Sequence, residues 1–213
     1  MSNRVNVAGI YNLEILKSSI SNGVKDFTFD LRPSSFNFIQ EYVLLELLEY
    51  ISLRDTSIYL HFEGEADFVI QKIVKDIRQV MASLGKLELI FSDSNSVDYY
   101  EQFQTPFHLV QKTDSLDPKL VESKLLAGLI LPADMIESIG LQKCLKMVGA
   151  VKNIDPDRMI STEVRYDKDR IVETHKHIPN DQLFFTIGSN LETAYRQVDT
   201  IRIKKHLSSL IRA

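Results

Sequence analysis

The sequence has little of what marks several large classes of protein. Its 213 residues include one cysteine, Cys144, which excludes an internal disulfide and a four-thiolate zinc site. It has no apolar run of the roughly 18 residues that a membrane-spanning helix needs. The opening residues lead straight into a strand-like segment, so we expect no secretory signal peptide. These absences predict a cytoplasmic protein that does not bind a membrane.

The charge is nearly balanced, with 25 Lys and Arg against 29 Asp and Glu and a net charge of -4 at pH 7. Nucleic-acid-binding proteins usually carry basic clusters interleaved with aromatics, and none occurs here. The chain also lacks a P-loop, a dinucleotide-binding fingerprint and a nucleophilic triad motif. We therefore expect no nucleic-acid partner and no cofactor, and the oligomeric state stays open.

What the chain does have is a repeated alternation of short apolar runs and helical stripes, and 44% of its residues are hydrophobic. We predict strands at 5–10, 27–31, 57–62, 87–91, 106–110, 127–131, 183–187 and 200–203. Helical periodicity separates several of them, most clearly at 37–52 and 69–84. Strands that alternate with helices pair in parallel. Eight such units favour a single α/β domain over 1–213, a closed TIM-type (β/α)8 barrel, over the alternative of an open doubly wound sheet.

One stretch, 150–181, is polar and has no clear period. A structureless connection of that length is unusual inside a compact domain. We expect it to be an irregular insertion after the sixth strand, either a lid or a contact arm. Alternatively it contains a small hairpin, because 160–166 alternates well enough to form a strand.

Four short segments resemble motifs of phosphoribosylanthranilate isomerase, the small barrel enzyme of tryptophan biosynthesis. They are Asn-Val-Ala-Gly-Ile at 6–10, Phe-Asp-Leu-Arg-Pro-Ser-Ser-Phe-Asn at 29–37, Phe-Thr-Ile-Gly-Ser-Asn-Leu-Glu-Thr-Ala at 185–194 and Val-Asp-Thr-Ile-Arg-Ile at 198–203. They follow the strand order of that family. The resemblance implies a (β/α)8 barrel and, for an active member, isomerase or lyase chemistry on a sugar phosphate.

The chain departs from the family where the chemistry resides. Ala8 stands where the family has its general base, a cysteine, and a methyl group cannot accept a proton. Asn37 replaces the arginine that grips the substrate carboxylate. The family's general acid is an Asp at the end of the sixth strand, but 127–131 contains no acid and Asp134 lies beyond it. Asp199 alone matches, at the position of a substrate-orienting Asp. The resemblance therefore implies a repurposed or catalytically retired member.

Function in such a barrel is carried by the C-terminal strand ends. The polar residues predicted there are Asp30, Arg32, His61, Glu63, Asp93, Lys112, Ser189, Asn190, Arg202 and Lys204. Asp30 or His61 could serve as a relocated base. His61, Glu63 and Lys112 could form an acid–base set or, equally, a buried ion pair. Arg32 could bind an anionic ligand or be an ordinary loop arginine.

The turn Gly188-Ser189-Asn190 offers a second possible anion site. A glycine before a capped helix presents backbone N–H groups that can hold a phosphate, with Arg202 or Lys204 adding charge. The same three residues also suit an ordinary helix N-cap.

Two other features favour a structural interpretation. Glu173, His175 and His177 alternate as metal ligands could, but such residues in a charged loop are usually solvated, and we expect no metal. Cys144 lies in a helical run, where a cysteine is usually a small buried hydrophobe.

Three functional hypotheses follow. The first is a barrel that binds a small anionic or phosphorylated ligand with altered or no catalysis. The second is a non-catalytic interaction domain that uses the arm 150–181. The third is a retained phosphoribosylanthranilate isomerase with a relocated base.

Overall fold

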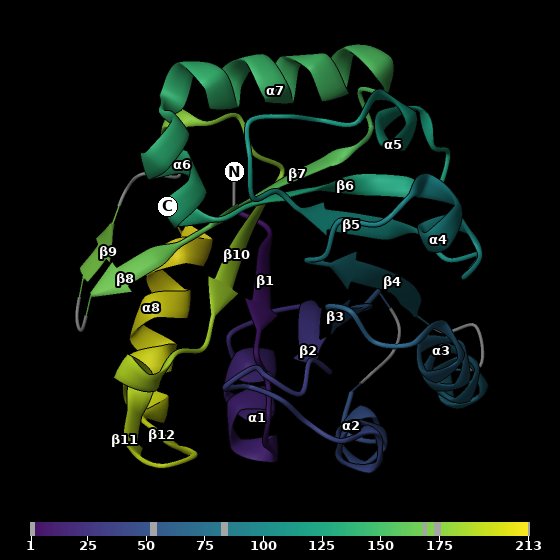
Figure 1. The fold of residues 1–213 in the computed structure, drawn as a ribbon. Helices are drawn as coiled ribbons and strands as arrows, with labels where there is room; N and C mark the ends of the chain where they lie inside the picture. Colours follow the sequence, from purple (N-terminus) through teal and green to yellow (C-terminus); the bar gives the residue numbers. More distant parts are fainter. Residues whose placement is uncertain (1–2, 52–54, 82–84, 168–169, 173–175, 213) are drawn as a thin grey trace.

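The computed structural model describes residues 3–51, 55–81, 85–167, 170–172 and 176–212. Its centre is a closed barrel of eight parallel strands in the order β1-β10-β7-β6-β5-β4-β3-β2 (Figure 1), which confirms the predicted fold class. The strands are β1 (Val5–Ala8), β2 (Asp26–Asp30), β3 (Ser57–Phe62), β4 (Lys86–Phe91), β5 (Phe107–Val110), β6 (Leu126–Leu131), β7 (Met159–Glu163) and β10 (Gln182–Thr186).

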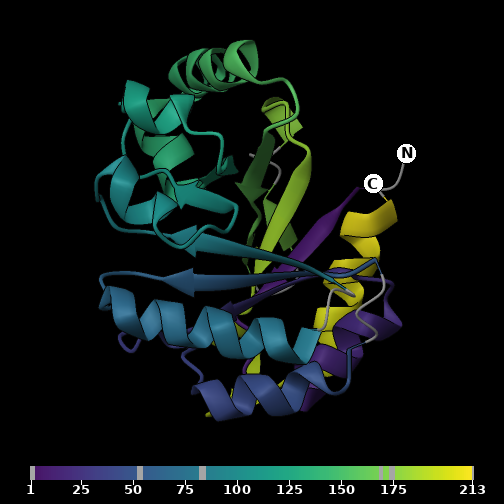
Figure 2. The same cartoon turned by 90° about the vertical axis from the view of Figure 1, so that its right-hand side faces the viewer.

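Helices cover the outside of this barrel. They are α1 (Leu13–Ser21), α2 (Glu41–Leu48), α3 (Asp67–Met81), α4 (Val97–Glu101), α5 (Pro118–Glu122), α6 (Ala133–Ile139), α7 (Leu141–Ile154) and α8 (Thr200–Arg212). Figure 2 shows α2 and α3 on one side of the strands and the group from α5 to α7 on the other. The cover is uneven, because α3 has 15 residues whereas α4 and α5 have five each.

Helix starts follow the signals in the sequence. The Asn12 side chain accepts a hydrogen bond from the Ile15 N–H and caps α1. Asp117 caps α5 in the same way through the Lys119 N–H, with Pro118 in the first turn. A side-chain acceptor at these positions satisfies one of the backbone donors that a helix leaves unpaired at its start.

The two faces of the strands bury different chemistry. The outward face joins the helices in the main hydrophobic core, to which Val7, Phe29 and Leu60 belong. The inward face holds a small second apolar cluster of Ala8, Tyr59, Ile90, Ile130 and Phe184. Polar side chains that alternate with the outward apolar residues share this interior: Asn6, Asp26, Thr28, Asp30, His61, Glu88, His108, Ser161 and Gln182 are all buried. Barrel interiors are usually dominated by bulky apolar residues, so this one is unusually polar.

One buried pair links two strands inside the barrel. Glu88 Oε2 lies 2.6 Å from His108 Nε2, and the two side chains are 0% and 1% exposed. Burial favours a raised pKa for Glu88, but the bonds from His108 and Lys86 outweigh it and hold the pKa at about 2. Glu88 is therefore an ionised carboxylate in the interior.

The structure corrects the end of the predicted strand order. Residues 200–203 begin α8 and are not the eighth strand. Ile201 is 81% exposed, whereas Ile203, Leu207 and Leu210 are buried at helical spacing. The seventh barrel strand is β7, which lies inside the stretch predicted to be irregular, and the segment predicted as strand seven is β10, the eighth.

The stretch 150–181 also contains a small hairpin, which the sequence suggested as an alternative. This hairpin comes after β7 and begins at Arg165, further along the chain than the suggested start at residue 160. It pairs β8 (Arg165–Asp167) with β9 (Arg170–Val172). A second small hairpin, β11 (Glu192–Ala194) with β12 (Gln197–Val198), precedes α8. The helix predicted at 37–52 is also shorter, because the chain from Leu31 to Gln40 forms a loop at the end of β2 before α2 begins.

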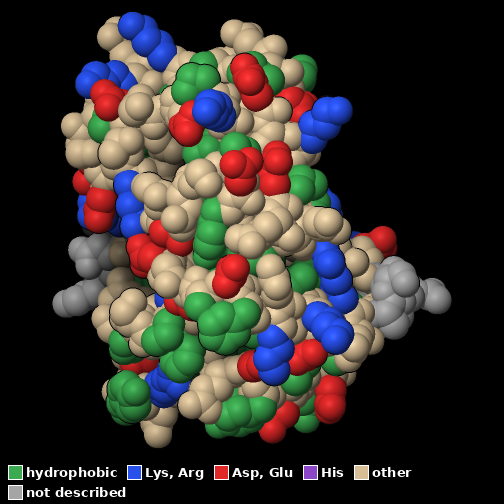
Figure 3. Space-filling model, turned by 45° about the vertical axis from the view of Figure 1, so that its right-hand side comes forward, with side chains coloured by type: hydrophobic (Ala, Val, Ile, Leu, Met, Phe, Trp, Pro, Cys, Tyr) green, Lys and Arg blue, Asp and Glu red, His purple; other side chains and the backbone are tan. Residues whose placement is uncertain are grey.

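The face of the molecule drawn in Figure 3 carries acidic and basic side chains that alternate with apolar ones, without a large area of one sign. Among the helices that the structure describes, none has the length and apolarity needed to cross a membrane.

Candidate functional site

A cavity of about 440 Å³ opens at the C-terminal ends of the barrel strands, and we call it the mouth cavity. This end of a parallel barrel is where TIM-type enzymes bind their ligands. Its lining residues come from the ends of all eight strands or the loops that follow them: Ala8, Gly9, Thr28, Asp30, Arg32, Ser35, Asn37, His61, Glu63, Ser92, Val110, Lys112, Ile130, Pro132, Glu163, Phe184 and Thr186.

Asp30 and Arg32 form a two-bonded ion pair beside this cavity. Arg32 Nε lies 2.8 Å from Asp30 Oδ1, and Nη2 lies 2.7 Å from Oδ2. The Ser35 hydroxyl donates a further bond to Asp30 Oδ2. Burial alone favours a raised pKa for Asp30, but Arg32 outweighs it and the pKa lies below its ordinary value. Both carboxylate oxygens of Asp30 thus already accept hydrogen bonds, which makes Asp30 a weak candidate for a general base.

His61 lies next to this pair and is neutral at physiological pH. Its Nε2 and the Ser92 hydroxyl share a short hydrogen bond. Burial, together with the positive charges of Arg32 and Lys112, lowers the pKa of His61 to about 3. A histidine with this pKa binds a proton poorly, so His61 orients Ser92 more readily than it abstracts a proton.

Glu63 lies between the two cations of the cavity. Its Oε1 is 2.6 Å from Lys112 Nζ, and its Oε2 is 3.6 Å from Arg32 Nη1. The Lys112 side chain is 55% exposed and that of Glu63 34%. Here the structure brings together His61, Glu63 and Lys112, the three residues that the sequence suggested as a set.

Two further groups were missed as candidate ligands by sequence reasoning. Glu163, at the end of β7, accepts bonds from the Ala133 N–H at 3.2 Å and the Thr186 hydroxyl at 3.1 Å. It was overlooked because β7 was not recognised as a barrel strand. Asn37 donates from Nδ2 to the Ile187 carbonyl at 2.7 Å. Its Oδ1 is buried and has no hydrogen-bond partner among the described residues.

Gly9 explains how Asn37 reaches this position. The glycine has φ +78°, and a Cβ there would lie 2.2 Å from Asn37 Nδ2. Only glycine combines this left-handed backbone with such a close approach. The glycine of the first resemblance motif therefore makes room for a side chain of the second.

The turn predicted to bind an anion does not line the mouth cavity. The Gly188 N–H donates to the Tyr166 hydroxyl at 2.9 Å, and that hydroxyl donates to the Thr186 carbonyl at 2.6 Å. Ser189 and Asn190 begin a helical turn of only three residues. The backbone N–H of Gly188, which was expected to bind a phosphate, is therefore already hydrogen-bonded to the Tyr166 hydroxyl of the β8–β9 hairpin.

Asp199, Arg202 and Lys204 are also absent from the cavity lining, because they belong to the start of α8 and not to a strand. Asp199 Oδ1 accepts the Arg202 N–H at 3.0 Å and caps the helix. Arg202 Nη1 donates to the Asn190 carbonyl at 2.9 Å, and Lys204 is exposed. These residues hold the junction between β10 and α8.

The remaining sequence candidates lie elsewhere. Asp93 accepts the Gly64 N–H at 2.8 Å and contacts the Tyr100 hydroxyl. Glu173 and His175 lie outside the described residues, and His177 is exposed. Within the described ranges, no group of three or more His, Cys, Asp or Glu could hold a metal ion. Cys144 is buried in α7, which raises the pKa of its thiol.

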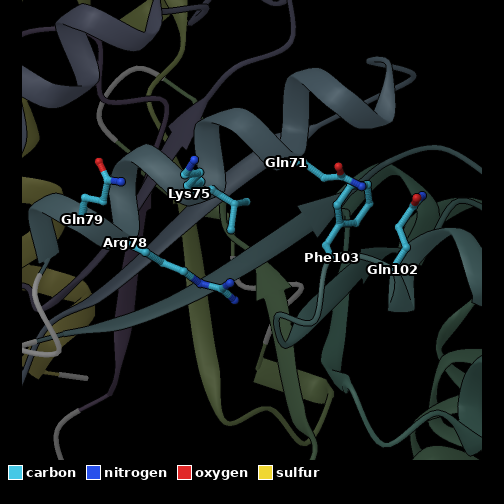
Figure 4. Close-up of a pocket in the computed structure, with 7 residues that line it drawn as sticks. Gln71, Lys75, Arg78, Gln79, Gln102 and Phe103 are labelled. Atoms are coloured by element: carbon cyan, nitrogen blue, oxygen red, sulfur yellow. The ribbon is translucent and has the colours of Figure 1, made fainter.

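A groove of about 380 Å³ lies on the outside of the barrel, between α3 and the residues that follow α4 (Figure 4). Arg78 extends from α3 and donates to the Gln104 carbonyl at 3.0 Å and the Thr105 hydroxyl at 2.6 Å. Its charge therefore ties the helix to a loop. The groove lies apart from the strand ends, and we interpret it as part of the helical packing.

The architecture and the cavity define the class: this is a closed parallel (β/α)8 barrel of TIM type. Among such barrels, the chain is similar to phosphoribosylanthranilate isomerases over nearly its whole length. The enzyme from Thermus thermophilus superposes with a TM-score of 0.73 at 14% identity, covering 97% of this chain and 98% of that one. The enzyme from Thermotoga maritima gives 0.70 at 13% identity, covering 99% and 100%.

This likeness establishes the fold and leaves the reaction open. A tryptophan synthase structure from M. tuberculosis superposes with a TM-score of 0.64 at 12% identity, covering 99% of this chain and 94% of that one. One fold can therefore carry differently named activities. No protein-family model matches the sequence, and no curated protein sequence matches it.

Proposed function

We propose that the mouth cavity binds a small ligand with hydrogen-bond donors and an anionic group, phosphate or carboxylate, with altered or no catalysis. The observation that carries the proposal is Asn37, a residue of the cavity lining whose buried Oδ1 has no hydrogen-bond partner among the described residues. Leaving a buried acceptor unpaired costs about 1–3 kcal/mol. A ligand hydroxyl or amino group placed there recovers that cost.

The anionic part of the ligand is inferred from Glu63. Its carboxylate already lies between Lys112 and Arg32, where a ligand anion would find two cations. Ion pairs at such exposure contribute at most about 1 kcal/mol. A ligand phosphate or carboxylate can therefore displace Glu63 at little cost.

The inference of altered or absent catalysis rests on three groups. Ala8 contributes a methyl group to the cavity, where the resembled family has a cysteine base. Asp30 is engaged by Arg32, and the pKa of His61 is held at about 3. Neither group is tuned to take a proton from carbon at neutral pH.

The alternative of an interaction domain with a detachable arm loses its main support. Residues 150–181 include β7, a strand of the closed barrel, so they do not form a separate arm. An open cavity at the strand ends also suits a small ligand better than a protein partner.

Thermal unfolding in the presence of ribose 5-phosphate, inorganic phosphate and sulfate tests the proposal. A ligand at 100 times its Kd stabilises the folded state by about 2.7 kcal/mol, which is several degrees in Tm for a chain of this size. Lys112→Ala and Asn37→Ala should reduce the shift, and Lys204→Ala, an exposed lysine away from the cavity, should not. No shift above one degree with any probe at millimolar concentration would count against the proposal.

Growth of a tryptophan auxotroph that lacks the isomerase separates altered from retained chemistry. We expect no growth when the chain is expressed in such a strain as soluble protein. Growth at a normal rate would show that the isomerase reaction is retained despite Ala8.

A further inference from the structure

A second cavity, of about 290 Å³, opens directly beside the mouth cavity, and we call it the side pocket. The two cavities share three lining residues, Ser92, Val110 and Lys112. They are therefore neighbours across a common wall at the ends of β4 and β5. Ser92 and Lys112 also contact His61 and Glu63 of the mouth cavity.

The side pocket exists because the helical layer is thin at this place. The outward faces of β5 and β6 present Leu109 and Leu129, which are covered by α4 and α5, of five residues each. Elsewhere the strands are covered by longer helices such as α3 and α7. Two single-turn helices and their connecting loops leave a space between helix and sheet.

About half of the lining of this space is apolar, and Leu109, Leu116, Leu120, Val121, Leu126 and Leu129 contribute to that part. Its polar groups are largely occupied by one another. Gln111 Nε2 donates to the carbonyls of Thr113 and Ser115 at 2.8 and 2.7 Å. The Tyr100 hydroxyl donates to the Asp93 carbonyl and accepts the Asn95 N–H. The pocket thus offers apolar contact to an occupant and few free hydrogen bonds.

A volume of about 290 Å³ is slightly below the roughly 300–1,000 Å³ typical of a whole ligand site. The space therefore suits one group of a ligand better than a complete ligand. Because Lys112 lies at the boundary, a molecule whose anionic group binds Lys112 can extend its remainder into this space.

We propose that the side pocket takes an apolar group, about the size of a single ring, of the same ligand whose polar and anionic part occupies the mouth cavity. The inference rests on the proposed function, since it places one end of the ligand at Lys112. It adds a specificity that the mouth cavity alone does not have. Ligands with an apolar substituent next to the anionic group bind more tightly than those without one.

Calorimetric titration with phenyl phosphate and inorganic phosphate tests the inference. Burying one ring in an apolar pocket is expected to strengthen binding about tenfold or more relative to inorganic phosphate. In Leu116→Trp, which fills the pocket from a half-buried loop position, phenyl phosphate should bind no better than inorganic phosphate, whose affinity should not change. Leu120→Phe provides a second filling variant, and Leu145→Trp, on the exposed face of α7, should retain the difference.

A direct readout is the methyl resonances of Leu109 and Leu129. They should shift with phenyl phosphate and stay unchanged with inorganic phosphate. Equal affinities of the two probes for the wild-type protein would overturn the side pocket and leave the mouth cavity standing. If a folded filling variant bound neither phenyl phosphate nor inorganic phosphate, the side-pocket proposal would also be contradicted. If neither probe bound the wild-type protein, both proposals would be overturned.

Discussion

The ends of β2, β3 and β5 place charged side chains at the mouth cavity, whereas polar groups at the ends of β7 and β10 mainly form hydrogen bonds that hold the backbone there. In the first region Glu63 and Lys112 stay partly exposed and can exchange partners. In the second, Tyr166 closes the Gly188 turn. Binding of an anion is therefore expected on the first side of the mouth, although the sequence had suggested both.

Removing the buried acid of the barrel interior, below the first region, should have the largest effect on stability. Glu88→Ala removes the buried carboxylate that both His108 and Lys86 contact, and removing one member of a buried ion pair costs about 3–5 kcal/mol. Urea unfolding measures the loss. Glu137→Ala, which removes an exposed partner of Arg165, serves as the control and should leave the unfolding midpoint unchanged. Equal effects of the two variants would show that the interior pair is unimportant.

Two glycines allow the regions to be compared: Gly9, which packs against Asn37 beside the first region, and Gly188 in the second. Gly9→Ala should cost about 2–4 kcal/mol, because a left-handed backbone conformation and a clash with Asn37 both oppose the new methyl group. Gly188→Ala should cost much less, since Gly188 has φ -116° and its nearest neighbour, Asn190 Oδ1, is 3.0 Å from the added Cβ. Urea unfolding of both variants checks the difference, and a reversed order would contradict the role given to Gly9.

His61 should make stability depend on pH. Its pKa in the folded protein is about 3, below the ordinary value of 6.5. Between these two pH values His61 is protonated in the unfolded chain and neutral in the folded protein. Stability should therefore fall as pH drops from 6.5 toward 3, by about 2 kcal/mol between pH 7 and 5. His61→Gln should remove that part of the dependence, and His177→Gln, at an exposed position, should not. An unchanged slope in His61→Gln would show that the histidine is not held neutral.

The smallest effect is expected at the turn closed by Tyr166. Tyr166→Phe removes the acceptor of the Gly188 N–H and should cost about 1 kcal/mol in urea unfolding. Phosphate affinity should not rise, because the freed N–H does not line the mouth cavity. A clear gain in phosphate affinity would instead point to a latent anion site at the end of β10.

The sequence predicted the barrel and the first region of the site because local patterns encode both. The apolar runs of β2 and β3 end directly at Asp30 and His61, so these side chains could be placed without tertiary information. At the end of β4 the sequence suggested Asp93, whereas Ser92 lines the mouth cavity. The sequence-based prediction of the second region was wrong, also because of local patterns. β7 reads Met-Ile-Ser-Thr-Glu, with polar residues directed into a polar interior, whereas Thr-Ile-Arg-Ile at 200–203 resembles a strand until its spacing to Leu207 is seen.

Asn37 shows what no local pattern can reveal. Its environment depends on Gly9, 28 positions earlier in the chain, and on the Ile187 carbonyl, 150 positions later. The unpaired Oδ1 follows from that packing and not from the sequence around it.

The most direct test is a crystal structure of the protein soaked with ribose 5-phosphate. The account predicts the phosphate between Lys112 and Arg32, with Glu63 turned away and a sugar hydroxyl bonded to Asn37 Oδ1. A phosphate bound instead at the Gly188 turn or at the start of α8, with Glu63 in place, would contradict it.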